Sequence, residues 1–215
     1  MLKRNMSKKP DITVVSATPT IRAYDPFANM ASTSDISVSA DNWKCELVQP
    51  NHPALRRRAN IDPFSVDADW NAREIEMCNL MHDKIGIGLA CPQIGNSYNL
   101  FVMKHSILGD IGCFNPKILE TAGSDDLYEE GCLSFPLIYL QITRPEKVKV
   151  EYTKSDGETV VQTWMDGIDA RCFQHEFEHL QGELFIQHVS DFKLQRAMKK
   201  RDKTIRRLQK ELKKA

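Results

Sequence analysis

Two histidines placed four residues apart are the first candidates for chemistry in this chain. His175 and His179 flank Glu176 in the stretch HEFEHLQG. On an α-helix, side chains four positions apart project side by side, so these two imidazoles can hold one metal ion. Glu176 lies about 100° around such a helix and can reach a water on that ion without being a ligand. The spacing indicates a hydrolytic metal centre, whereas two histidines facing a core are the ordinary alternative.

A catalytic metal centre needs a third protein ligand and one open position. Phe185 stands where one class of zinc proteases carries a third histidine, and no acidic ligand pattern follows downstream. Upstream, Cys132 in EEGCLSFP offers a thiolate, a strong soft ligand, and Gly131 lets the backbone come close. Taken alone, Cys132 would be interpreted as a buried structural thiol. Its occurrence together with HEFEH favours a ligand.

Helical periodicity places the histidines and predicts a second helix earlier in the chain. From Gly167 to about Gln181, Ile168, Cys172, His175 and His179 fall on one helical face. Between about residues 67 and 82 the apolar positions also follow a helical spacing, and Asp67 or Asp69 can cap that helix at its start. Its apolar residues are Trp70, Ile75, Met77, Cys78, Leu80 and Met81.

Strands are predicted on both sides of a glycine-rich connection. IGIGLACPQIG precedes the apolar, strand-like NLFVM and a further short run that ends at FNPKIL. EKVKVEYT and TVVQTWM alternate with a period of two and flank Ser155, Asp156 and Gly157. Because two alternating runs joined by turn residues are typical of a β-hairpin, we expect these two segments to pair.

Composition limits the class of protein. The 215 residues are 41% apolar and 27% charged, which is typical of one globular domain with an appendage. Apolar runs fall short of the roughly 20 residues that span a bilayer. The six cysteines include no CxxC pair, which argues against a disulfide framework and for a reducing compartment. A net charge of +0 neither favours nor excludes nucleic acid.

The two ends of the chain differ from its middle. Residues 1–42 show no sustained periodicity and predict a flexible N-terminal extension, so we assign the catalytic domain to 43–192. Residues 193–215 hold eleven Lys and Arg against Asp202 and Glu211. Their apolar residues recur at helical intervals, so the end predicts a basic amphipathic C-terminal helix. These apolar residues are Leu194, Met198, Ile205, Leu208 and Leu212.

Three separated motifs resemble those of the peptide deformylases, in the order found in that family. They are GIGLACPQ (Gly86 to Gln93), EGCLS (Glu130 to Ser134) and QHEFEHLQG, and similar segments extend the likeness over roughly residues 45–215. The resemblance implies an α+β fold in which antiparallel β-sheets surround a central helix that carries HExxH, with a C-terminal helix. It also implies that EGCLS lies on a neighbouring strand and presents Cys132 to that helix.

The resemblance further implies a metal and a reaction. Cys132, His175 and His179 would hold one divalent ion per chain, typically Fe(II), with Zn(II) or Ni(II) as alternatives. A metal-bound hydroxide would attack the formyl carbon of an N-formylmethionyl peptide, and formate would leave. Glu176 would act as general base and then general acid. The side-chain amide of Gln93 and the backbone N–H of Leu133 would stabilise the oxyanion.

Substrate contacts follow from the same likeness. A peptide would pair in β-fashion along Gly86, Ile87, Gly88 and Leu89. Ile168 and Cys172, on the face of His175, are candidates for the wall of the methionine pocket, and ordinary core packing is an equally good account of each. The remaining expected contacts are Ile87 again, Tyr128, Glu130, Gly131 and Tyr139.

Some residues depart from the family pattern. Cys91 replaces the usual alanine of the first motif and Pro92 precedes Gln93. Glu178 replaces the usual aspartate, so we predict an ion pair between Glu178 and Arg144 made with a longer acid. Tyr139 occupies a place where many bacterial members carry a substrate-binding arginine, so contacts beyond methionine would differ.

The expected partners are nascent N-formylmethionyl polypeptides, with no membrane and a monomeric chain. The expected setting is the cytoplasm of a bacterium, with a virus in a bacterial host or an organelle as alternatives. Residues 193–215 have two interpretations, a solvated helix packed on the domain or a contact to ribosomal RNA. Two rival functions are a metalloprotease, which leaves EGCLS and GIGLACPQ unexplained, and an inactive RNA-binding protein, which leaves the complete set of catalytic residues unexplained.

Overall fold

Residues 43–213 are described by a computed structural model, and the predicted N-terminal extension lies outside them. Along the chain the helices and strands are α1 (Trp70–Asp83), β1 (Gly88–Ala90), β2 (Leu100–His105), β3 (Gly109–Gly131), β4 (Tyr139–Thr153), β5 (Val160–Asp166), α2 (Gly167–Gln181) and α3 (Asp191–Leu212). The five strands lie between α1 and α2 in the chain, and both helices contact strands, as expected for an α+β domain.

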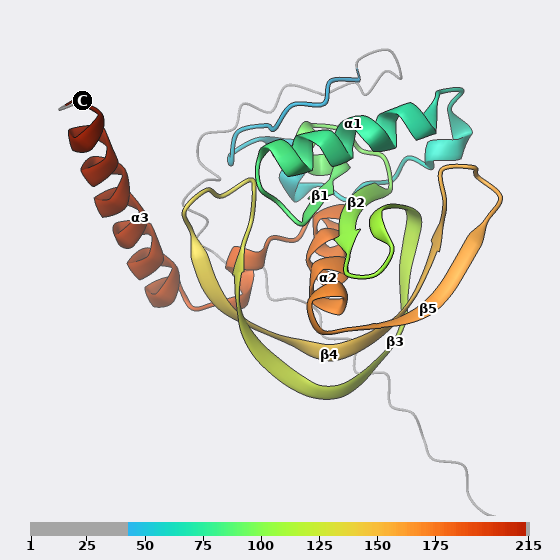
Figure 1. The fold of residues 1–215 in the computed structure, drawn as a ribbon. Coiled ribbons are helices and arrows are strands. Elements are labelled where there is room, and N and C mark those ends of the chain that lie inside the picture. Colours follow the sequence, from blue (N-terminus) through green and yellow to red (C-terminus); the bar gives the residue numbers. More distant parts are fainter. Residues whose placement is uncertain (1–42, 214–215) are drawn as a thin grey trace, which may run out of the picture.

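The five strands pair in the order β1-β2-β3-β4-β5, and every pair is antiparallel. The resemblance implied several sheets, whereas the described strands form one continuous sheet. Its long members explain the difference: β3 has 23 residues and its pairing with β4 shifts register at three places. Such bulges bend a strand, and in Figure 1 β3 and β4 curve around α2. One sheet therefore covers more than one side of the helix.

The predicted hairpin is confirmed. Val148 pairs with Met165 and Thr153 with Val160, and the intervening turn contains Gly157 with a φ of +74°. Asp156 accepts hydrogen bonds from the backbone N–H groups of Glu158 and Thr159, which closes the turn. The strand β4 begins earlier than the alternating run suggested, at Tyr139.

The helix α1 begins after Asp69, whose side chain accepts a hydrogen bond from the N–H of Ala72. Trp70, Met77, Cys78 and Met81 are buried as the apolar spacing predicts, but Ile75 is 52% exposed. A helix that rests on one side of a sheet buries only a stripe of its surface, and Ile75 lies outside that stripe.

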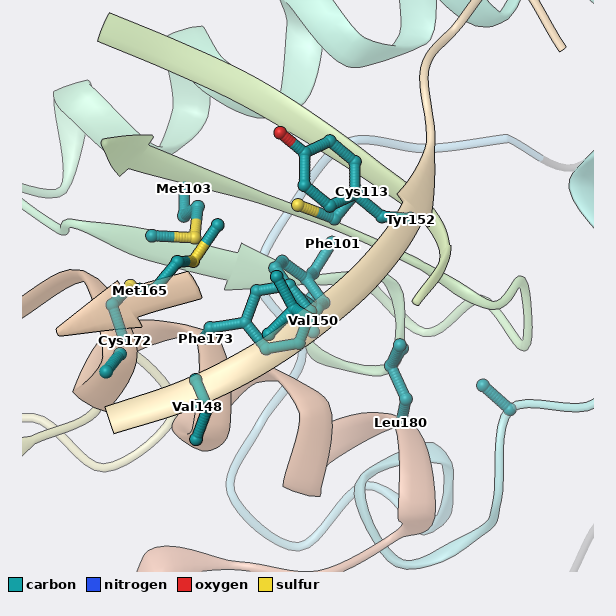
Figure 2. Close-up of a cluster of buried hydrophobic side chains, with 13 residues drawn as sticks. Phe101, Met103, Cys113, Val148, Val150, Tyr152, Met165, Cys172, Phe173 and Leu180 are labelled. Carbon is teal, nitrogen blue, oxygen red and sulfur yellow. The ribbon is translucent and has the colours of Figure 1, made fainter. Parts of the chain in front are cut away.

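The helix α2 has the bounds that the sequence predicted and buries ten of its 15 residues. It contacts β1, β2, β4 and β5. Figure 2 shows the apolar contacts between α2 and the sheet. Phe173 and Cys172 of α2 pack in one buried cluster with Phe101, Val150 and Met165 of the strands. The rings of Phe101 and Phe173 pack edge to face with centroids 5.0 Å apart.

Phe185, the residue in place of a third histidine, is buried in a second cluster with Phe135 and Leu194. It follows Gly182, which ends α2 in a left-handed conformation. Leu194 is the first apolar residue of the C-terminal helix, so this cluster also anchors the start of α3.

The helix α3 extends from the domain, as Figure 1 shows. Leu194 is its buried residue, and Ala197 and Met198 pack partly against the core, whereas Leu208 and Leu212 are exposed. Among residues 43–213 we find no helix that is both long and apolar enough to cross a membrane.

Candidate metal centre

Three donor groups from two elements converge at one point. α2 carries His175 and His179, and Cys132 comes directly after the end of β3. One donor atom of each residue lies within 4.8 Å of the others, and Cys132 Sγ is 3.2 Å from His179 Nε2. The six cysteines are all free thiols. The described residues contain no other group of three His, Cys, Asp or Glu donors with this spacing.

The last residues of β3 fix the position of Cys132. Gly131 pairs with Tyr139 at the end of the β3–β4 ladder, and a Cβ built on Gly131 would lie 3.0 Å from the Tyr139 ring. The chain then turns, with the N–H of Phe135 donating to the carbonyl of Cys132 at 3.0 Å. The glycine therefore allows the close approach that brings the thiol to α2.

Glu130 orients His175. Its Oε2 lies 3.0 Å from His175 Nδ1, which leaves the opposite ring nitrogen for a metal. Arg144 donates to both oxygens of Glu130, at 2.6 Å and 3.0 Å, and Arg171 donates to Oε1 at 2.7 Å. Burial opposes ionisation of Glu130, but the hydrogen bonds from His175 and Arg144 outweigh burial and lower its pKa. Glu130 is therefore a carboxylate that fixes the imidazole.

The chemistry of the donors fits a divalent transition metal. Burial alone would raise the pKa of the Cys132 thiol, but the neighbouring His179 and His175 lower it to about 5. A thiolate and two imidazoles form a set that suits zinc, iron and nickel rather than magnesium or calcium. Three ligands also leave a fourth position open, as a catalytic centre requires.

Glu176 is buried beside these donors, and burial raises the pKa of its carboxyl to about 7. Within the described residues its Oε2 has no hydrogen-bond partner. Gly88 of β1 lies against it, because a Cβ built there would be 2.7 Å from both Cγ and Cδ of Glu176. The glycine thus leaves the space in which the carboxylate stands, and the unpartnered oxygen can accept a proton.

Gln93 points its amide nitrogen toward the centre. Its Oε1 accepts the N–H of Ala90 at 2.8 Å, which fixes the orientation of the amide. Its Nε2 then donates to Ser134 Oγ at 3.2 Å and to Cys132 Sγ at 3.5 Å. Both Gln93 and Ser134 are buried. The amide N–H group is therefore aimed at the centre by two flanking contacts.

The ion pair expected between Arg144 and Glu178 is present, with contacts of 2.5 Å and 2.9 Å. The longer acid has a second partner. His188 Nε2 lies 2.9 Å from Glu178 Oε1, the oxygen that also accepts a hydrogen bond from Arg144. Burial opposes the charge of Glu178, but His188 and Arg144 lower its pKa to about 2. Arg144 thus joins two carboxylates, Glu130 and Glu178, behind the metal ligands.

A cavity of about 750 Å³ opens onto the centre. Most of the residues predicted from the sequence line it: Gly86, Ile87, Gly88, Gln93, Glu130, Gly131, Cys132, Leu133, Tyr139, Ile168, Cys172, His175 and Glu176. Ile168 is half exposed and Cys172 is buried, so the predicted wall consists of one residue at the surface and one in the core.

Two of the residues predicted to bind substrate lie elsewhere. Leu89 is fully buried in the cluster beside α1, because alternate residues of a strand face opposite sides. Tyr128 is exposed, and its ring contacts the Arg171 guanidinium rather than the cavity. Neither side chain lines the cavity, and the backbone pairing of a peptide along Gly86 to Leu89 stays a prediction.

Several residues of the site were not predicted from the sequence. Ser134 and Arg171 act through partners far along the chain, Gln93 and Glu130, which no local spacing reveals. Ile85, Pro136, Leu137 and Ile138 also line the cavity. The available signal for Ser134 was its position inside the EGCLS motif.

Comparisons with known proteins agree on one family. The family model described as polypeptide deformylase matches residues 44–195. A peptide deformylase of Caulobacter vibrioides is 44% identical over 153 residues, which cover 68% of this chain and 87% of the relative.

Solved structures give the same result. A peptide deformylase from Legionella pneumophila superposes with a TM-score of 0.67 and 34% identity, over 76% of this chain and 96% of that one. One from Synechococcus elongatus has a TM-score of 0.65 and 35% identity, over 73% of this chain and 85% of that one. Most of α3 lies beyond the residues that the family model matches.

Proposed function

The chain belongs to the peptide deformylase family, and on that basis we propose that it removes the formyl group from N-formylmethionine at the start of newly synthesised polypeptides. The observation that carries the proposal is the convergence of Cys132, His175 and His179 beside the unpartnered oxygen of Glu176. Formate and a free amino terminus are the products.

Cys132, His175 and His179 hold one divalent metal ion in this proposal, iron(II) in the cell and zinc(II) or nickel(II) in isolated protein. A metal held there would lower the pKa of a water, so that it can lose a proton at neutral pH and act as the nucleophile, and would withdraw charge from the formyl oxygen. Glu130 keeps the His175 ring oriented during the reaction, since its carboxylate is itself held by Arg144 and Arg171.

Glu176 transfers a proton from the attacking water to the departing amine. Its raised pKa suits a group that takes a proton from the attacking water and returns it to the departing amine near neutral pH. Gln93 and the backbone N–H of Leu133 donate to the developing oxyanion. Because Cys132 Sγ is the more distant of the two acceptors of Gln93, that contact is the one that the amide gives up to the substrate.

Ser134 is therefore expected to act as a positioning residue for the Gln93 amide. Replacing Ser134 with alanine removes the acceptor that fixes the Gln93 amide, and we expect kcat to fall about tenfold, the value of one hydrogen bond, with KM little changed. Steady-state formate release from formyl-Met-Ala-Ser measures both constants. Ser134→Thr, which keeps the hydroxyl, should recover most of kcat. An unchanged kcat in Ser134→Ala would show that Gln93 needs no such support.

The substrate lies along β1 in this proposal. β1 is the edge strand of the described sheet and lines the cavity through Gly88, so an extended peptide can add to it by backbone hydrogen bonds. Ile87, Ile168 and Cys172 provide apolar surface for the methionine side chain. The remaining predicted contacts, Glu130, Gly131 and Tyr139, line the same cavity.

One assay separates this function from its rivals. The full chain, purified without oxygen and loaded with nickel(II), is incubated with formyl-Met-Ala-Ser and with acetyl-Met-Ala-Ser, and formate and peptide fragments are measured. We expect formate from the first peptide and no fragment from either. Cleavage within the peptides would indicate a protease, and absence of formate from the loaded enzyme would refute the proposal.

We further propose that the protein acts as a monomer wherever formyl-initiated chains are made, in a bacterial cytoplasm, a virus-infected bacterium or an organelle. α3 is the element suited to meet the ribosome there. Its second half projects from the domain and exposes four cations that no core contact requires, namely Lys203, Arg206, Arg207 and Lys210. A cluster of exposed cations on one helix favours an RNA phosphate backbone.

Neutralising these four residues of α3 to glutamine should weaken binding to purified ribosomes by more than tenfold at low salt. We expect the slope of log K against log salt to become shallower by up to about four, one for each lost phosphate contact. Co-sedimentation across a salt series measures both quantities. Arg57→Gln with Arg58→Gln, two exposed cations outside α3, is the matched control. Unchanged binding of the α3 variant would show that these four cations do not contact the ribosome, and α3 would then be a solvated helix of the domain.

A further inference from the structure

Residues 43–48, which we call the strap, connect α1 with the back of the candidate metal centre. In Figure 1 they lie in the blue segment beside α1. Trp43 and Leu47 pack partly against the apolar cluster that α1 shares with β1 and β2. The backbone N–H of Val48 then donates to the backbone carbonyl of Gln93 at 2.9 Å. The strap therefore ends on the residue whose side-chain amide faces the centre.

Trp43 fixes one end of the strap on α1. The Arg73 guanidinium lies over the rings of both Trp43 and Trp70, with its Cζ 4.7 Å from each ring centroid. A guanidinium in this position is attracted by the quadrupole of each indole. The indole N–H of Trp43 also donates to Glu76 Oε2 at 2.7 Å. Two different contacts with one helix therefore hold this side chain in place.

The other end of the strap supports the turn that carries Gln93. This residue lies in the 3₁₀ helix Cys91–Ile94, which ends at Gly95 with a φ of +81°. A Cβ built on Gly95 would lie 3.2 Å from Cγ1 of Val48. Val48 thus lies against this helix at two points, through its N–H and through its side chain. Because a 3₁₀ helix of four residues has weak hydrogen bonds of its own, such outside contacts hold its backbone in place.

The direction of the Gln93 amide depends on where this backbone lies. Its Oε1 accepts the N–H of Ala90, and its Nε2 donates to Ser134 and Cys132. A donor must lie about 2.7–3.1 Å from the position of an oxyanion in order to stabilise it. A shift of the turn by about 1 Å would therefore take the amide out of reach. Leu47 lines the cavity, so the strap also forms part of its wall.

We propose that Trp43 is a positioning residue for deformylation, which acts through the strap to hold Gln93 where its amide meets the oxyanion. The proposal rests on the proposed deformylase function and on the part that Gln93 has in it. Trp43 is not among the residues that line the cavity, so it has no direct contact with the substrate there. Its loss should therefore lower kcat and leave KM unchanged, as expected for an interaction that matters only in the transition state.

A double-mutant cycle on the nickel-loaded full chain tests the proposal, with formyl-Met-Ala-Ser as substrate. Trp43→Ala should lower kcat about tenfold and leave KM within about twofold. In a Gln93→Ala background the same substitution should lower kcat by less than about twofold, because the amide that it misplaces is already absent. The melting temperature should fall equally in both backgrounds. Equal losses of kcat in both backgrounds would overturn the proposal.

Two further variants separate the contact from a general loss of structure. Trp43→Phe keeps a ring beside Arg73 and lacks the N–H that donates to Glu76, so its kcat should lie between those of the wild type and Trp43→Ala. It also keeps the proposal testable if Trp43→Ala does not fold. Trp164→Ala is the matched control, because Trp164 is a half-exposed tryptophan of β5 outside the cavity, and its kcat should stay within about twofold of the wild type. A wild-type kcat in both Trp43 variants would refute the proposal.

Amide hydrogen exchange gives a measurement that does not depend on turnover. The N–H groups of Val48 and Ala90 donate to the backbone carbonyl and to the side chain of Gln93, respectively. In Trp43→Ala both should exchange about tenfold faster, a larger increase than in the amides of β4, and Trp164→Ala should show no such difference. If the wild type releases no formate, the deformylase function fails, while faster exchange at these two amides still supports the coupling. Unchanged exchange at both would refute it.

Discussion

Glu176→Gln is expected to lower kcat for formate release by about a thousandfold, within the range of 10²–10⁴ that general acid–base catalysis contributes. The substitution keeps the shape of a buried side chain and removes the oxygen that accepts and returns the proton. Because Glu176 is not one of the three converging donors, metal content should stay near that of the wild type. Formate release from formyl-Met-Ala-Ser and elemental analysis of the same sample measure the two quantities.

A second substitution tests the position of the carboxylate rather than its chemistry. Gly88→Ala introduces a Cβ where Glu176 stands, so the carboxylate must move and kcat should fall although Glu176 is intact. Gly112→Ala is the matched control. Gly112 lies on β3 of the same sheet, away from the cavity, and its Cβ would lie 2.6 Å from Cδ of Glu74. A Glu176→Gln enzyme within threefold of the wild-type rate would exclude Glu176 from proton transfer.

Local periodicity was sufficient for the parts of the site that lie on one element. The bounds of α2 were predicted because a repeat of 3.6 residues is visible in the sequence itself, and so was the pairing of β4 with β5. The full length of β3 was not, because its residues 119–129 are largely exposed and lack the alternation of a half-buried strand. Pairing with β4, and not its own pattern, makes that segment a strand.

Contacts between distant segments could not be derived from spacing. Cys132 alone would be interpreted as a structural thiol, whereas its occurrence together with HEFEH and its likeness to a known motif favoured a ligand. Ser134, Arg171 and His188 support the site through partners 10 to 41 residues away. The direction of the Leu89 side chain, which is buried beside α1, depends on the register of β1 against β2, and the short strand does not reveal that register.

Glu178, the residue that departs from the motif the sequence resembles, has two partners in the structure. One oxygen of Glu178 contacts both Arg144 and His188, so the longer acid gains a second partner here. The pKa of Glu178 lies below its ordinary value of 4.5, so its stabilisation is complete above that pH and is lost as the pH falls toward 2. Arg144 therefore holds a carboxylate that stays charged throughout the neutral range.

Arg144→Ala is expected to lower the free energy of unfolding by about 3–5 kcal/mol at pH 7, because Glu130 and Glu178 would lose their shared partner while buried. His175 loses part of its support through Glu130, so metal affinity should fall by about 10- to 100-fold. Urea unfolding and titration with a competing chelator measure the two effects.

Arg144→Lys keeps the charge without the fork of N–H groups, and both effects should be intermediate. This variant also keeps the prediction testable if Arg144→Ala fails to fold. Arg58→Ala, at an exposed position, should change the unfolding free energy by no more than about 0.5 kcal/mol. If Arg144→Ala retained both the stability and the metal affinity of the wild type, the two-carboxylate bridge would be incidental to the centre, and Glu130 would have to orient His175 through Arg171 alone.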